Sequence, residues 1–151
     1  MDSTTKQIAF IATKIWITAL TVNTALGLYV VSDSVKMPVG DLAVKGLIYG
    51  AVFSFPIFLV VWLMLYLMIK GMFSAGNIFL ILLVAAGLLT LGSFYLFSEY
   101  MQLSASLNIP LGGSALAASA LGILPQFNPI RKACFQRDHP GHFRRRDKVE
   151  A

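Results

Sequence analysis

GLIYGAVFSFPIFLVVWLMLYLMIK, residues 46–70, is the stretch that decides the fold. Its first twenty-four residues, from Gly46 to Ile69, include no charged side chain. At about 1.5 Å per residue, a helix of that length extends about 36 Å, which is enough to cross a hydrocarbon core about 30 Å thick. The stretch therefore predicts a membrane-spanning helix, and the chain around it an integral membrane protein.

The composition of the whole chain agrees with this prediction. Hydrophobic residues make up 57% of the 151 residues and charged residues only 13%, whereas soluble domains average about 25% charged residues. A chain of this length is accounted for by one bundle of three or four helices. The single cysteine excludes a disulfide within the chain.

Four apolar stretches predict an all-α, polytopic transmembrane helix bundle over residues 1–125. The predicted spans are about 8–31, 46–69, 77–97 and 104–124, and residues 32–45 and 71–76 are predicted connections. The fourth span is the least regular, because Asn108, Pro110 and two adjacent glycines interrupt its first half. Three interpretations of it stay open, namely a kinked full span, a short span, and a re-entrant segment that follows only three spans.

The first apolar stretch has one other interpretation. Ala25 and Gly27 have the spacing of small residues at a signal-peptide cleavage site. Lys14, however, falls inside what would be the apolar core of such a peptide, and the stretch is long. These two features favour an uncleaved first span.

Residues 126–151 are polar and basic and predict a flexible cytoplasmic tail that is dispensable for folding. From Arg131 onward there are seven basic and three acidic residues, so the high pI reflects the tail and predicts no nucleic-acid partner. Arg144, Arg145 and Arg146 are expected to contact anionic lipid headgroups. With four spans, the excess of basic residues places both termini in the cytoplasm, and we expect the plasma membrane, specifically a bacterial inner membrane.

Two strips of small residues at i, i+4 and i+8 predict close helix packing, since lipid supplies no hydrophobic force between helices. The strips are Gly46, Gly50 and Ser54 in the second span, and Ser114, Ala118 and Gly122 in the fourth. Such strips serve either packing within the bundle or self-association.

Two prolines inside the spans predict kinks. Pro56 lies near the middle of the second span and Pro110 in the fourth, and each removes one backbone hydrogen bond from its helix. We expect the hydroxyl of Ser54 to compensate for the polarity exposed near Pro56.

Few polar groups lie at depth in the spans. Asn23, Thr90 and Ser93 can bond across helices or line a path for a solute, and apart from Lys14 near one end the spans carry no ionisable group of the kind that ion-coupled transporters use. His139, His142 and Cys134 are too few for a metal site, and no nucleophile lies beside a base. We therefore expect neither an enzyme nor a protein that binds a metal or cofactor.

The first functional hypothesis is an accessory or protection factor that acts through helix contacts with another membrane protein. In size and layout the chain is similar to colicin-immunity and conjugative entry-exclusion proteins, although no sequence motif carries the likeness. The alternatives are a channel-like or holin-like membrane oligomer and a small transporter. The Thr, Ser and Asn side chains in the spans are the groups that would line a polar lumen.

Overall fold

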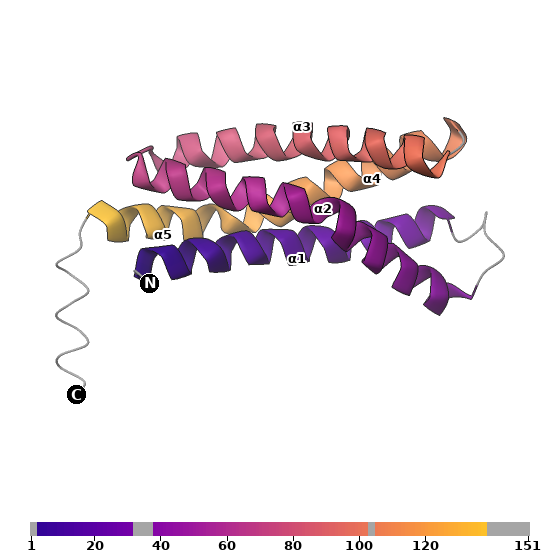
Figure 1. Ribbon diagram of the computed structural model, residues 1–151. Coiled ribbons are helices and arrows are strands. Elements are labelled where there is room, and N and C mark those ends of the chain that lie inside the picture. Colours follow the sequence, from indigo (N-terminus) through magenta and orange to yellow (C-terminus); the bar gives the residue numbers. More distant parts are fainter. Residues whose placement is uncertain (1–2, 32–37, 103–104, 139–151) are drawn as a thin grey trace.

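A computed structural model describes residues 3–31, 38–102 and 105–138 (Figure 1). Within these ranges the fold is all-helical, as predicted. The elements are α1 (Ser3–Val31), α2 (Val39–Lys70), α3 (Ala75–Met101), α4 (Ala105–Ile123), the short 3₁₀ helix η1 (Leu124–Gln126) and α5 (Phe127–Asp138). Four helical stretches are long and apolar enough to cross a membrane, in agreement with four predicted spans, and the fourth continues from α4 through η1 into α5.

Helix α2 begins earlier than predicted, because Pro38 and Gly40 do not break it. Pro38 occupies the N-cap position with φ −55°, and its carbonyl accepts a hydrogen bond from the backbone N–H of Leu42 at 3.1 Å. Gly40 falls in the first turn, where Asp41 also favours the positive end of the helix dipole. Residues 39–45, predicted as part of a loop, are therefore the first two turns of α2.

The turn between α2 and α3 is tighter than the predicted connection over residues 71–76. Met72 takes the left-handed conformation at φ 61°, although a glycine precedes it. The hydroxyl of Ser74 then accepts the backbone N–H of Asn77 at 3.3 Å and caps α3. Because this cap lies so close to the end of α2, the two helices are joined by a turn of only a few residues.

The four long helices run alternately in opposite directions (Figure 1). Helix α1 packs most extensively against α4 and then against α2, while α3 packs against α4 and α2. Helices α2 and α4 therefore occupy opposite corners of the bundle. Helix α2 changes direction part-way along its length (Figure 1), and it continues through Pro56 as one helix.

Packing differs between the two ends of the bundle. The end that we call the closed end contains the first half of α1, the second half of α2, the start of α3, the end of α4 and α5. Its fully buried large side chains are Ile8, Ile11, Leu65, Ile69, Ile78, Leu82, Ile123 and Ile130. At the opposite end, which we call the open end, none of the described hydrophobic side chains is buried. The bundle is thus filled at one end and loosely packed at the other.

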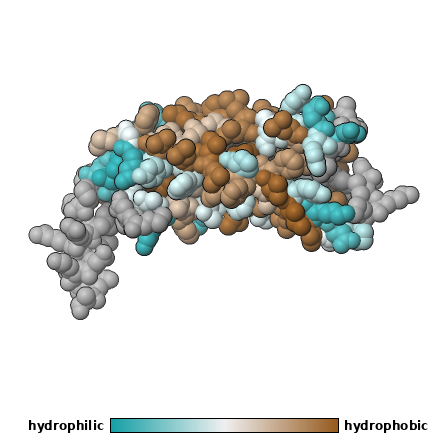
Figure 2. Space-filling view, viewed as in Figure 1, coloured by the Kyte–Doolittle hydropathy of each residue, from teal (hydrophilic) through white to brown (hydrophobic). Residues whose placement is uncertain are grey.

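The surface of the bundle is apolar along its middle. On the face seen in Figure 2, hydrophobic residues occupy the central part and hydrophilic residues gather mainly toward the two ends. The large hydrophobic side chains that are exposed include Leu59, Leu63, Leu88 and Leu96, on α2 and α3. This distribution is what a helix bundle surrounded by lipid requires.

Helix α5 corrects the prediction of a flexible tail that begins at residue 126. Ile130, Ala133 and Cys134 are spaced i, i+3 and i+4 and are buried against the bundle. The guanidinium Nη1 of Arg137 donates to the backbone carbonyls of Ile69 at 2.9 Å and Phe73 at 3.2 Å. The sequence did not predict this helix, because its three apolar positions and Arg137 lie among many polar residues. Residues 139–151 lie outside the described part of the chain.

Candidate functional site

A cavity of about 420 Å³ lies between α1, α2, α3 and α4 and extends from the buried residues of the closed end into the open end of the bundle. Along α1 it extends from Ala12 to Leu28, and on α2 its lining starts at Leu42 and Lys45, in the part near the open end that we call its mouth. Ligand pockets in proteins commonly have volumes of about 300–1,000 Å³. The cavity is therefore large enough to be a binding site.

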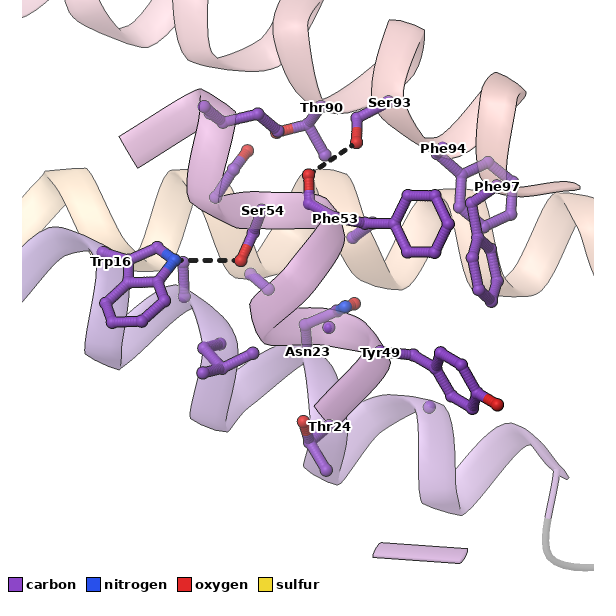
Figure 3. A pocket seen from close by; sticks show the side chains of 18 of the residues that line it. Trp16, Asn23, Thr24, Tyr49, Phe53, Ser54, Thr90, Ser93, Phe94 and Phe97 are labelled. Carbon is purple, nitrogen blue, oxygen red and sulfur yellow. Dashed lines mark hydrogen bonds between the residues drawn. The ribbon is translucent and has the colours of Figure 1, made fainter. Parts of the chain in front are cut away.

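The wall between α1 and α2 is built by the strip of small residues on α2. A Cβ at Gly46 would lie 3.4 Å from Cγ2 of Thr24, and a Cβ at Gly50 would lie 2.9 Å from Cδ1 of Leu20. The hydroxyl of Ser54 accepts a hydrogen bond from the indole Nε1–H of Trp16 at 2.9 Å (Figure 3). The strip thus contacts α1 of the same protomer.

Trp16 anchors the deeper part of this wall. Its ring centroid is 5.4 Å from that of Phe58 and 6.4 Å from that of Phe55 in an edge-on arrangement. Its one polar atom is satisfied by Ser54, so the indole contributes a large apolar surface without an unpaired donor. Trp16 was not predicted as a site residue, although a tryptophan inside an apolar stretch is a signal that the sequence contains.

The wall between α2 and α3 depends on Ser93. Its hydroxyl donates to the carbonyl of Phe53 at 3.1 Å (Figure 3), which adjoins the carbonyl of Val52, the one that loses its helical N–H partner at Pro56. The hydroxyl of Ser54, which was expected to compensate near Pro56, donates to the carbonyl of Ala51 at 3.5 Å. Hydroxyls of α2 itself and of α3 therefore both bond backbone carbonyls just before Pro56, and neither bonds the carbonyl of Val52.

The strip on α4 forms the seam with α1. Ser114, Ala118 and Gly122 are all buried. A Cβ at Gly122 would lie 2.8 Å from the backbone carbonyl of Ile15 and 3.2 Å from Cβ of Ala19. The absence of a side chain at Gly122 therefore lets the backbones of α1 and α4 approach closely at the inner end of the cavity.

The polar groups of the cavity are few and uneven in position. Asn23 and Thr90 line it (Figure 3), and no hydrogen bond joins the Asn23 amide to another described side chain. The hydroxyl of Thr24 is buried without a partner. Lys45 is the only charged side chain among the described residues that line the cavity. The arrangement offers hydrogen bonds and one positive charge rather than acid–base or nucleophilic chemistry.

The remaining predicted site residues lie elsewhere. Pro110 is exposed on α4 and does not line the cavity. Arg144, Arg145 and Arg146 fall outside the described residues, as do His139 and His142. Among the residues that the structure describes, no group of three or more potential metal ligands comes together.

Comparison of the chain with protein-family models, with curated proteins and with solved structures found no match.

Proposed function

We propose that this chain is a non-enzymatic, multi-pass protein of the plasma membrane, in bacteria the inner membrane, that acts as an accessory or protection factor on another membrane protein. The observation that carries the proposal is the outward surface of the long helices. Large apolar side chains stand exposed along them, for example Leu88 at 66% and Leu96 at 65%. Such an extended apolar surface favours contact with lipid and with other transmembrane helices.

The charges at the two ends support an orientation with both termini in the cytoplasm. The closed end carries the exposed cations Lys6, Lys14, Lys70, Arg131 and Lys132, together with Asp138, which is paired with Arg137. The described part of the open end carries Lys45 together with Asp41 and Glu99. Because basic residues favour the cytoplasmic side, we assign the closed end to the cytoplasm. The mouth of the cavity then faces the outer leaflet.

The internal use of both small-residue strips favours a partner over self-association. Gly46 and Gly50 contact α1, and Gly122 contacts α1 from the other side. A second copy would have to displace these contacts to use the same strips. The outward surface is instead formed by larger apolar side chains, such as Leu88 and Leu96, and this surface is the one that we propose a helix of a different protein contacts.

The channel-like or holin-like alternative has less support. A pore within one protomer would have to continue through the closed end, where Leu65, Ile69 and Ile78 are fully buried. A pore between protomers would have to be lined by the outward faces, which carry aliphatic and aromatic side chains. Neither arrangement supplies the polar lumen that conduction of ions needs.

The proposal is tested by photo-crosslinking in the native membrane. A photoreactive amino acid replaces Leu88, which is exposed, or Leu82, which is fully buried and serves as the matched control on the same helix. We expect position 88, and not position 82, to form a covalent adduct with a different membrane protein of defined mass.

Two results would contradict the proposal. Adducts at position 88 with a second copy of this chain alone would favour the self-associating alternative. Adducts with lipid alone would remove the reason to assign a protein partner. Release of an entrapped dye from liposomes that contain the purified protein would separately support the channel-like alternative.

A further inference from the structure

The cavity changes character along its length. Its deep end, toward the closed end of the bundle, is lined by the buried side chains Ala12, Ile15, Val61 and Ala86. Its mouth is lined by Lys45, Tyr49 and Asn23. A site with an apolar interior and a polar, positively charged mouth is complementary to an amphiphile with an anionic head.

Asn23 and Lys45 lie close to each other in depth along the bundle. Gly46 faces Thr24, and α1 and α2 run in opposite directions, so Lys45 lies one residue nearer the open end and Asn23 one residue nearer the closed end, about 3 Å apart in depth at about 1.5 Å per residue. The Asn23 amide borders the cavity without a hydrogen bond to another described side chain. An amide in an apolar environment gains most from a partner that enters the cavity.

The length of the cavity suits one hydrocarbon chain. The α1 residues that line it, from Ala12 to Leu28, extend about 24 Å at about 1.5 Å per residue. One leaflet of a bilayer contributes about 15 Å, half of a hydrocarbon core of about 30 Å. From Asn23 to Ala12 at the deep end, α1 rises about 16 Å, so a chain that starts at the mouth reaches about the depth of one leaflet.

We propose that the cavity binds a long-chain fatty acid from the outer leaflet. The hydrocarbon chain lies between the four helices, with its methyl end near Ile15 and Val61. The carboxylate lies at the mouth, where the ammonium of Lys45 and the amide N–H of Asn23 donate to its oxygens. This inference stands apart from the proposed partner protein and needs only the cavity and the orientation of its mouth.

The binding test uses the purified full chain in phosphatidylcholine nanodiscs. The probe is palmitate with a diazirine at its methyl end, and mass spectrometry locates the photo-adducts. We expect adducts on the deep residues, such as Ile15 and Val61, and we expect unlabelled palmitate to prevent them. Hexadecanol has the same chain without the charge, and we expect it to compete about fivefold more weakly. This factor corresponds to the attraction between one basic residue and an anionic headgroup.

Two pairs of variants separate the cavity from the surface. Ala115→Phe places a ring in the cavity, whereas Ala117→Phe, two residues away on the exposed face of α4, is the matched control. Lys45→Gln removes the charge at the exposed mouth, and Lys45→Arg retains it. We expect Ala115→Phe to abolish the deep adducts, Ala117→Phe and Lys45→Arg to retain them, and Lys45→Gln to weaken palmitate competition about fivefold.

The proposal is overturned if the adducts spread over outward-facing residues, if Ala115→Phe labels like the unchanged chain, or if hexadecanol competes as well as palmitate. Equal competition by phosphatidylglycerol added to the nanodisc would overturn the single-chain occupant in favour of a diacyl lipid. The Lys45 pair lies on the exposed surface and tests the charge even if a ring at position 115 prevents folding. All these measurements use the purified chain, so they are independent of the crosslinking to a partner.

Discussion

At the scale of single residues, Gly122 marks the tightest approach of α4 to α1 among the described glycines. A Cβ there would lie 2.8 Å from the carbonyl of Ile15, a backbone atom that a rotamer change cannot move. We expect Gly122→Ala to lower the free energy of unfolding in mixed micelles by about 1–3 kcal/mol. Gly113→Ala is the matched control, because a Cβ at Gly113 meets nothing within 4 Å. Equal stability of the two variants would contradict the close α1–α4 seam.

The hydrogen bond between Trp16 and Ser54 is the second residue-scale test. Interhelical hydrogen bonds in membrane proteins contribute about 0.6 kcal/mol on average and up to about 1.7 kcal/mol. A double-mutant cycle with Trp16→Phe and Ser54→Ala should give a coupling energy in that range. The control cycle uses Ser119→Ala, because the Ser119 hydroxyl donates to the carbonyl of Leu116 in its own helix. A coupling energy near zero for Trp16 with Ser54 would show that the indole has another partner.

The sequence indicated these sites only in part. The i, i+4, i+8 spacing predicted strips at Gly50 and Gly122, because helical periodicity is local information. It could not name Leu20 or Ile15 as the opposing groups, since the pairing depends on how the helices are arranged around one another. The same limit explains why the hydrogen bond from Ser93 of α3 to the backbone just before Pro56 was not predicted.

At the scale of the elements, α5 stabilises the end of α2. Arg137 donates to two carbonyls at that end, Ile69 and Phe73, and cations are favourable at a helix C-terminus. We expect Arg137→Met to lower the free energy of unfolding by about 1 kcal/mol and to speed amide exchange in the last turn of α2. Arg131→Met, on the exposed face of α5, should change neither quantity.

Deletion of α5 extends this test. Ile130 and Ala133 are fully buried, and α5 packs against α1, α2 and α3. A chain that ends at Gln126 should therefore unfold at a lower temperature than a chain that ends at Asp138. Equal stability of the two chains would restore the sequence-based prediction that the whole segment is dispensable.

The elements were predicted to different degrees. Long uncharged runs are unmistakable, so the helical class and the four candidate spans followed from hydropathy alone. The start of α2 was placed late because Pro38 and Gly40 were taken as breakers, whereas here Pro38 is the N-cap and only Gly40 lies in the first turn, two positions at which a helix start tolerates these residues. Helix α5 was not predicted because only three of its residues form the buried apolar stripe, and these lie among Arg, Lys and Gln.

At the scale of the whole molecule, the uneven packing was not predictable from the sequence. Apolar residues are distributed along all four spans, so composition gives no sign that one end is filled and the other is hollow. The difference arises because the large aliphatic side chains of the closed end meet one another across the bundle. Toward the open end the walls depend instead on single contacts, such as that of Gly46 with Thr24.

The central claim is a four-span membrane protein whose closed end lies in the cytoplasm, and labelling of single cysteines tests it most directly. In a Cys134→Ala background, Gly40→Cys and Glu99→Cys probe the open end, while Met72→Cys and Lys132→Cys probe the closed end. We expect a membrane-impermeant maleimide to label positions 40 and 99 in intact cells, and positions 72 and 132 only after permeabilisation. Labelling of position 132 in intact cells, or of no position before permeabilisation, would contradict the account.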